Sequence, residues 1–329
     1  MAVDFGKAAG RAALSLGAVA LGAAAGAAAE RLVMRFSATP DGDVDLAEFY
    51  SLHGEPFEVF TSDGAVLAGE VDRLPESQVT IVMPHGFALN RNSWYYQRLA
   101  LRDRATLVFY DQRGHGESTY VSDAEQRDHS LDQLGRDLFS VINQVAPEDT
   151  LILIGHSMGG KAAMTLALRD PDLVRSLMVI DIAPVVYDHE YQPYIDAMRH
   201  VPVAELGRRS EAESYMESLI PDPSIRSFLL QNLGQDERGL NWQVNLDAIE
   251  NGISEILGFP DANGDPYEGP TKFLRGGKSD FVLDQHLPRI ESLFPMATLD
   301  TVSGAGHWVH AEKPEDVISA IRTFTADAA

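Results

Sequence analysis

The sequence predicts a doubly wound α/β fold with a helical insertion. Short apolar runs alternate with amphipathic helical stretches along most of the chain, and this alternation stops for about eighty residues between Pro184 and Pro270. Alternation of this kind places parallel strands in one sheet, with helices on both faces and the functional site at the carboxyl ends of the strands. We therefore expect a mostly parallel sheet of about eight strands, with a helical cap inserted after the sixth strand.

The expected strands are of two kinds. The first two flank Ser62-Asp63-Gly64-Ala65, whose Asp-Gly pair predicts the turn of a β-hairpin. The later runs are apolar throughout, as expected for parallel strands that are covered on both faces. Between them, Leu131–Val145 has its apolar residues on one helical stripe. The expected strands are 57–61, 66–71, 79–83, 106–110, 151–154, 177–180, 272–274 and 297–302.

The same pattern divides the chain into three parts. We expect residues 1–45 to form an Ala-rich helix and a polar linker, residues 46–183 and 270–329 to form the α/β core, and residues 184–269 to form the cap. The cap contains no convincing strand pattern, so we expect it to be helical. Its aromatic and methionine side chains are sufficient to cover an apolar pocket, although most of them are expected only to pack the cap.

Composition excludes several classes of function. The chain has 26 Lys and Arg against 49 Asp and Glu, and this net charge of −23 disfavours nucleic acid as a partner. The absence of cysteine excludes disulfides, thiolate metal sites and a cysteine nucleophile. No H-E-x-x-H or comparable ligand spacing is present, so no catalytic metal is expected. The sequence leaves the oligomeric state open.

The uncharged N-terminal run 12–29 has three interpretations. Its length, the preceding Lys7 and Arg11, and Gly22-x-x-x-Gly26 favour a membrane anchor. Small residues near its end also fit a cleaved signal peptide, and an Ala-rich soluble helix would have the same composition. Localisation is therefore left open between membrane-associated and cytoplasmic.

Gly155-His156-Ser157-Met158-Gly159 has the context of a nucleophile elbow. It follows the strand 151–154 and precedes a helical stretch, and a serine on such a tight turn takes strained backbone angles. Glycines two positions to either side allow neighbouring backbone to approach closely. The sequence therefore predicts Ser157 as the nucleophile of a serine hydrolase.

Two backbone amides are expected to form the oxyanion hole. His85-Gly86-Phe87 directly follows the strand 79–83, where an oxyanion loop would lie. We assign the hole to the amides of Phe87 and Met158, the latter being the residue after the nucleophile. For His85 itself we expect a structural hydrogen bond within its loop.

The general base is predicted to be His307. Gly304-Ala305-Gly306-His307-Trp308 follows the last expected strand and precedes an amphipathic helix, which places this histidine on a loop at the carboxyl end of the sheet. The residue order leaves two candidates for the acid. Asp181 ends the strand 177–180 and Asp280 follows the strand 272–274, and either carboxylate could orient the imidazole.

These motifs resemble those of the α/β hydrolases, and from Phe57 onward the chain is similar to the small-capped YbfF-like esterases. The resemblance is carried by Gly155–Lys161, Asp181–Pro184, Arg226–Leu230, Arg275–Ser279 and Gly304–His310. It implies that Asp181 is the acid and that Ser279 is an auxiliary hydroxyl that bonds the histidine. Asp280, directly after that serine, departs from the pattern. Residues 111–118 also match the wider fold and are interpreted as a structural loop.

The resemblance implies hydrolysis of short- to medium-chain acyl esters, without a cofactor. The small-molecule ester would meet His156, Tyr187, Tyr191, Phe228 and Trp308 in the pocket. Acyl transfer, thioester hydrolysis and perhydrolysis could use the same triad, and a hydrolase-fold receptor with little turnover is the alternative from another class. An aspartate nucleophile, as in dehalogenases and epoxide hydrolases, is excluded by Ser157.

Overall fold

A computed structural model describes residues 54–120, 128–147, 149–189, 191–237, 239–260 and 264–326. Within this part of the chain, residues 196–242 form one compact unit, and residues 54–195 with 243–326 form another. The N-terminal run 12–29 lies outside the described residues. No helix in the described part is both long enough and apolar enough to cross a membrane. The three-part division into 1–45, core and cap stays a prediction.

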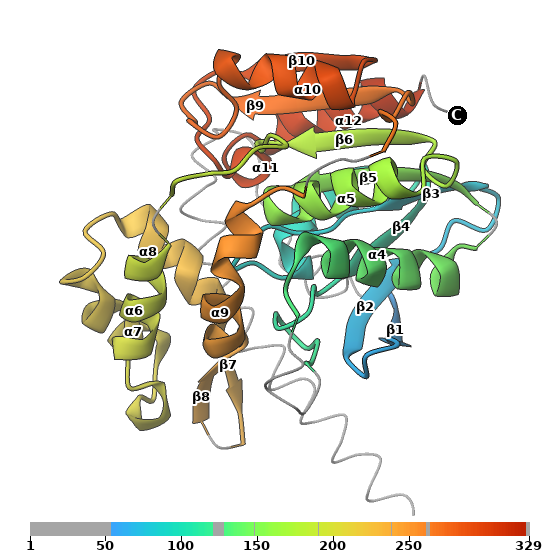
Figure 1. Ribbon diagram of the computed structural model, residues 1–329. Coiled ribbons are helices and arrows are strands. Elements are labelled where there is room, and N and C mark those ends of the chain that lie inside the picture. The colour runs from blue at the N-terminus through green and yellow to red at the C-terminus, as the bar shows by residue number, and fades with distance from the viewer. Residues whose placement is uncertain are drawn as a thin grey trace, which may run out of the picture. The chain divides into compact units, whose positions relative to one another are not determined.

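The larger unit is built on an eight-stranded sheet (Figure 1), as the sequence predicted. The strand order is β1-β2-β4-β3-β5-β6-β9-β10. The strands β1, β2 and β4 pair antiparallel, and all the other pairs are parallel. The strands are β1 (Glu55–Phe60), β2 (Val66–Asp72), β3 (Val79–Val82), β4 (Thr106–Tyr110), β5 (Thr150–His156), β6 (Ser176–Ile180), β9 (Thr271–Gly276) and β10 (Ala297–Val302).

Helices lie on both faces of this sheet, as Figure 1 shows. One face carries α4 and α5, and the other carries α3 and α12. The predicted helix at Leu131–Val145 is confirmed as α4: the Ser130 side chain caps its N-terminus and its apolar stripe is buried. The helices of this unit are α3 (Tyr95–Leu101), α4 (Leu131–Val145), α5 (Met158–Arg169), α9 (Leu246–Leu257), α10 (Leu287–Leu293), α11 (Val309–Glu312) and α12 (Pro314–Ala326), with the short 3-10 helices η1 (Arg91–Trp94) and η5 (Asp284–His286).

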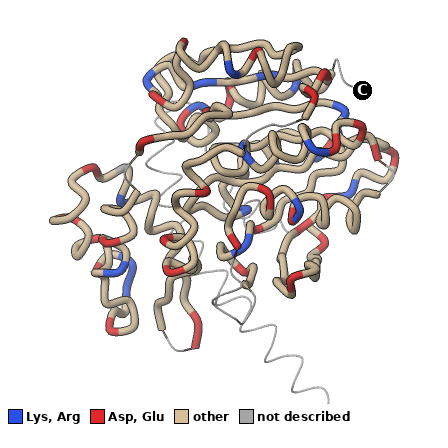
Figure 2. Tube along the Cα trace, viewed as in Figure 1, with Lys and Arg blue, Asp and Glu red and all other residues tan. Residues whose placement is uncertain are grey.

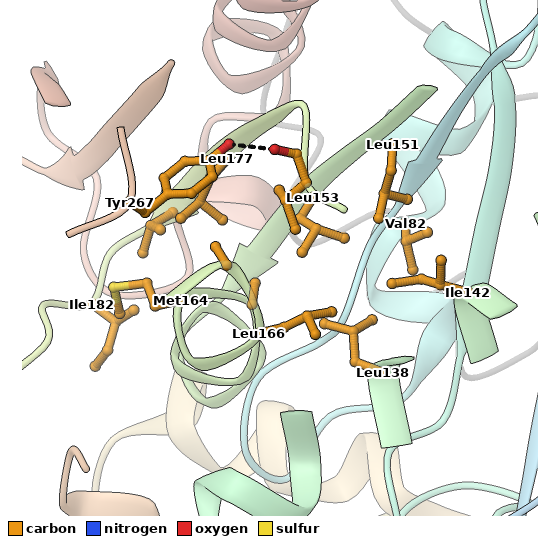
Figure 3. Close-up of a cluster of buried hydrophobic side chains, with 14 of the residues drawn as sticks. Val82, Leu138, Ile142, Leu151, Leu153, Met164, Leu166, Leu177, Ile182 and Tyr267 are labelled. Atoms are coloured by element: carbon orange, nitrogen blue, oxygen red, sulfur yellow. Dashed lines mark hydrogen bonds between the residues drawn. The ribbon is translucent and has the colours of Figure 1, made fainter. Parts of the chain in front are cut away.

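Successive residues of the central strands point to opposite faces of the sheet. In β5, Leu151 and Leu153 pack with α4 and α5, whereas Ile152 and Ile154 belong to the cluster beneath α3 and α12. Figure 3 shows the first cluster, in which the hydroxyl of Tyr267 donates to the Val174 carbonyl oxygen at 2.8 Å. Both faces of the sheet are therefore packed, which explains why these strands are unbroken apolar runs in the sequence.

The smaller unit contains a β-hairpin that the sequence analysis missed. The strands β7 (Leu233–Asp236) and β8 (Gly239–Trp242) pair antiparallel, so the expectation of a wholly helical insertion was wrong. The hairpin carries few of the β-branched residues that signal a strand, and Gly239 takes a positive φ of 116° at its turn. The other elements of this region are α6 (Gln192–His200), η3 (Val203–Glu205), α7 (Arg209–Glu217), α8 (Pro223–Leu229) and η4 (Leu230–Asn232), and the boundary between the units falls within α6.

Charged positions are spread along the described trace, with acidic ones in the majority (Figure 2). Some of the buried charges form ion pairs. Arg113 and Asp137 form two hydrogen bonds of 2.6 and 2.7 Å, and both side chains are at most 1% exposed. This pair fastens the loop 111–118 to α4, which agrees with its interpretation as a structural loop.

Candidate active site

Ser157 stands on a strained turn between β5 and α5. Its backbone φ is 51° and its ψ is −120°, values that residues other than glycine rarely adopt. A Cβ atom added to Gly155 would lie 2.4 Å from the carbonyl oxygen of Gly159, and one added to Gly159 would lie 2.2 Å from that of Pro84. At both positions the neighbouring backbone leaves no room for a Cβ atom, so glycine is required, as the motif predicted.

A chain of hydrogen bonds runs from this serine to a carboxylate. The Ser157 Oγ lies 3.1 Å from His307 Nε2, and His307 Nδ1 lies 2.8 Å from Asp181 Oδ2. With Nδ1 donating to the carboxylate, Nε2 is free to accept the serine proton. Three residues from the ends of β5, β6 and β10 are thus brought together at one edge of the sheet.

Asp181 is fully buried and accepts two further hydrogen bonds. Its Oδ1 accepts from the Gly276 amide at 2.8 Å, and its Oδ2 accepts from the Ser279 hydroxyl at 2.5 Å. The resemblance implied that this serine bonds the histidine. The structure corrects that expectation: Ser279 donates to Asp181, on the same oxygen that His307 contacts.

Asp280 has a different environment. Its side chain is 74% exposed, and its Oδ2 lies 3.7 Å from Nε2 of His189. Of the two aspartates that the sequence left open, only Asp181 is hydrogen-bonded to His307 among the described residues. The geometry therefore favours Asp181 as the acid.

The histidine is held by two residues that the sequence analysis did not single out. The ring of Phe281 stacks on that of His307, with centroids 3.7 Å apart. The carboxylate of Glu312 accepts from the amides on either side of His307, at 2.8 Å from Gly306 and 3.3 Å from Trp308. Their proximity in sequence to Ser279 and His307 was a signal, but nothing in the sequence gave the direction of their side chains.

His156 does not line the pocket, contrary to its expected contact with substrate. It is 1% exposed, and its Nε2 lies 2.9 Å from the carbonyl oxygen of His307. Burial lowers its pKa well below the usual value, so the ring is neutral and Nε2 donates to that carbonyl. A histidine inside the elbow therefore supports the loop of the general base.

The predicted oxyanion residues adjoin the serine. Phe87 and Met158 line the same pocket as Ser157, and a Cβ atom added to Gly86 would lie 3.2 Å from Ser157 Cβ. The next residue, Ala88, has a positive φ of 51°, and its amide donates to His115 Nε2 at 3.3 Å.

His115 and His85 hold this oxyanion loop in place. Burial lowers the pKa of His115 to about 3, so the ring stays neutral and keeps an acceptor for the Ala88 amide. His85 contacts the Gly86 carbonyl oxygen through Nδ1 at 2.8 Å, as expected for a structural hydrogen bond. His115 belongs to the loop 111–118, so this structural loop also supports the oxyanion loop.

The pocket is lined mostly by apolar side chains. Tyr187 and Tyr191 line it as expected. Trp308 is not among the lining residues, and Phe228 lies on α8 in the smaller unit, so its contact with substrate stays a prediction. In the described part of the chain, no group of acidic or histidine side chains could hold a metal ion. The lining residues are Phe87, Ser157, Met158, Lys161, Ile182, Tyr187, Tyr191, Ile256, Leu257 and Phe281.

Fold and site together define a serine hydrolase that acts on carboxylic esters. The chain belongs to the alpha/beta hydrolase family, whose model matches residues 81–320. Its substrates are accordingly small ester molecules.

Similar proteins belong to the same class of enzyme. The chain is 36% identical to the sn-1-specific diacylglycerol lipase ABHD11 of Mus musculus over 75% of this chain and 80% of that one. It is 31% identical to the esterase YbfF of Escherichia coli, covering 75% of this chain and 93% of that one. A marine microorganism esterase of solved structure superposes with a TM-score of 0.73 at 32% identity, covering 78% of this chain and 98% of the other.

Proposed function

We propose that this protein is a carboxylesterase that hydrolyses short- to medium-chain acyl esters through Ser157, His307 and Asp181. The observation that carries the proposal is the continuous hydrogen-bond chain from Ser157 Oγ through His307 to the buried carboxylate of Asp181. Each side chain has the partner that its role requires.

The reaction proceeds in two steps. The Ser157 oxygen attacks the acyl carbon while His307 Nε2 takes the hydroxyl proton, and the amides of Phe87 and Met158 donate to the oxyanion. The intermediate collapses to an acyl-enzyme, and the departing alkoxide receives the proton from His307. Water then repeats the sequence on the acyl-enzyme and releases the carboxylic acid. Each oxyanion donor contributes roughly 3 kcal/mol to lowering the barrier.

The lining of the pocket supports an acyl substrate, because the apolar side chains of Ile182, Ile256 and Leu257 lie beside Ser157. The name of the mouse relative adds diacylglycerols to the substrates that should be tested.

The test is a series of p-nitrophenyl esters from acetate to palmitate, together with a diacylglycerol, with wild type and Ser157→Ala compared. We expect wild type to prefer the shorter chains and Ser157→Ala to lose all but background hydrolysis. A fluorophosphonate probe should add one label to wild type and none to the variant, since it modifies an activated serine. Equal hydrolysis by the two proteins would refute the proposal, and ester formation from an added alcohol in preference to hydrolysis would redirect it to acyl transfer.

A further inference from the structure

Lys161 places a buried cation in the pocket, and the proposed hydrolysis does not use it. It lies one helical turn after the nucleophile, where its amide donates to the Ser157 carbonyl oxygen at 3.0 Å. The residue is 1% exposed, and among the lining residues of the pocket its side chain alone is cationic. A buried ammonium is costly unless its donors find acceptors, so its contacts require an explanation.

The ammonium group of Lys161 is bound by the end of one helix. Its Nζ donates to the carbonyl oxygens of Ile256 at 3.1 Å, of Leu257 at 2.8 Å and of Gly258. These three bonds use all the donors of an ammonium group. The ring of Tyr187 lies 4.7 Å from Nζ, and no carboxylate within the described residues forms an ion pair with it.

The three acceptors lie at the C-terminus of α9, where the carbonyl groups of a helix lack hydrogen-bond donors. The last carbonyl groups of a helix have no bond within it and carry partial negative charge, so a cation there is stabilising. The Leu257 carbonyl oxygen also accepts from the Tyr187 amide at 3.0 Å. Lys161 therefore ties the end of α9 to the helix that follows the nucleophile.

The tied segment is itself part of the pocket lining. Ile256 and Leu257 lie beside Ser157 and Met158 around the same cavity. We propose that Lys161 is a specificity-determining residue, which sets the longest acyl chain that the pocket accepts by fixing the end of α9. This inference rests on the proposed ester hydrolysis.

The test replaces the ammonium with an unbranched apolar side chain of similar length. Lys161→Met should raise the ratio of kcat/KM for p-nitrophenyl dodecanoate to that for butyrate on the order of tenfold, the scale of a few methylene contacts. Lys161→Arg keeps the charge and should keep the wild-type ratio. Lys272→Met, at a partly exposed ion pair with Asp300, is the matched control and should leave the ratio unchanged.

A second measurement uses the wild-type protein and covers the case in which Lys161→Met does not fold. Burial lowers the pKa of Lys161 to about 7. The titratable side chains that line the pocket with it are Tyr187 and Tyr191; burial raises the pKa of both phenols, so they stay neutral in this range. Above about pH 7 the neutral amine has only two donors for three carbonyl groups, so the ratio should rise between about pH 6 and about pH 8.5. Any pH effect on a step that the two esters share cancels in the ratio.

The outcomes separate the two proposals. Hydrolysis that depends on Ser157, with a ratio that stays flat with pH and is unchanged in a folded Lys161→Met variant, overturns the role of Lys161 alone. The absence of Ser157-dependent hydrolysis overturns both proposals. A raised ratio in Lys161→Met, together with a wild-type ratio in Lys161→Arg and Lys272→Met, supports the inference.

Discussion

Strands β6 and β9 are neighbours in the sheet, and an aspartate follows each of them. Asp181 is fully buried and accepts hydrogen bonds from Gly276, Ser279 and His307. Asp280 is 74% exposed, and its Oδ2 lies 3.7 Å from Nε2 of His189. The contrast teaches that a carboxylate in the right place in the chain order is not enough. The acid of a triad must also be desolvated and fixed by donors, so that its charge acts on one imidazole nitrogen.

The largest effect is expected at Asp181. Asp181→Asn should lower kcat on the order of 10⁴-fold, because the amide favours the wrong histidine tautomer. Steady-state kinetics on one short ester would measure this, with circular dichroism to establish that the variant is folded. A variant that retained more than a tenth of wild-type activity would show that the acid lies elsewhere.

The second largest effect is expected at Ser279. Replacing this residue tests whether its hydroxyl positions the acid. Ser279→Ala removes a hydrogen bond to a charged group, worth about 1.5–3 kcal/mol, so kcat should fall roughly tenfold to a hundredfold. Ser303→Ala, at an exposed serine near the general base, is the control. An unchanged kcat would mean that the Gly276 amide and the surrounding packing position Asp181 without the Ser279 hydroxyl.

A third carboxylate extends the comparison, because Glu312 accepts from both amides that flank His307. In Glu312→Gln one acceptor oxygen becomes a donor, so kcat should fall by less than about tenfold while KM stays constant. Glu315→Gln, on the exposed first turn of α12, should have wild-type kinetics. A rise in KM with kcat unchanged would contradict a positioning role.

The smallest effect is expected at Asp280. Asp280→Asn alters an exposed side chain, so kcat and the free energy of unfolding should change by no more than about twofold and about 0.5 kcal/mol. Chemical denaturation and the same ester assay measure both. A loss comparable to that of Asp181→Asn would reverse the comparison between the two strand ends.

The sequence predicted the fold because both faces of the sheet are packed. Burial on both sides forces the unbroken apolar runs of β3 to β6, and the glycine at 155 is required by contact with the backbone of Gly159, four residues later. The hairpin β7–β8 escaped prediction because it carries few β-branched or aromatic residues, so the signal for a strand was absent.

The finer features of the site depend on side-chain directions that periodicity does not encode. The sequence placed His156 in the elbow, but only the fold turns its ring toward the His307 carbonyl group. Likewise, the sequence shows Lys161 only as one charged residue in an apolar helical stretch. The fold places three carbonyl oxygens around its Nζ, from the end of α9 some ninety-five residues later. Contacts over such separations require the tertiary structure.

Three residues other than glycine take positive φ among the described residues, and they are Ala88, Ser157 and Asp181. Each follows one of the strands β3, β5 and β6, and each costs on the order of 1–3 kcal/mol of backbone strain. Glycine would relax all three. A population of variants selected for heat resistance alone should therefore accumulate Ser157→Gly, whereas selection for ester turnover should retain the serine. In directed evolution, thermal stability and turnover would therefore favour different residues at position 157.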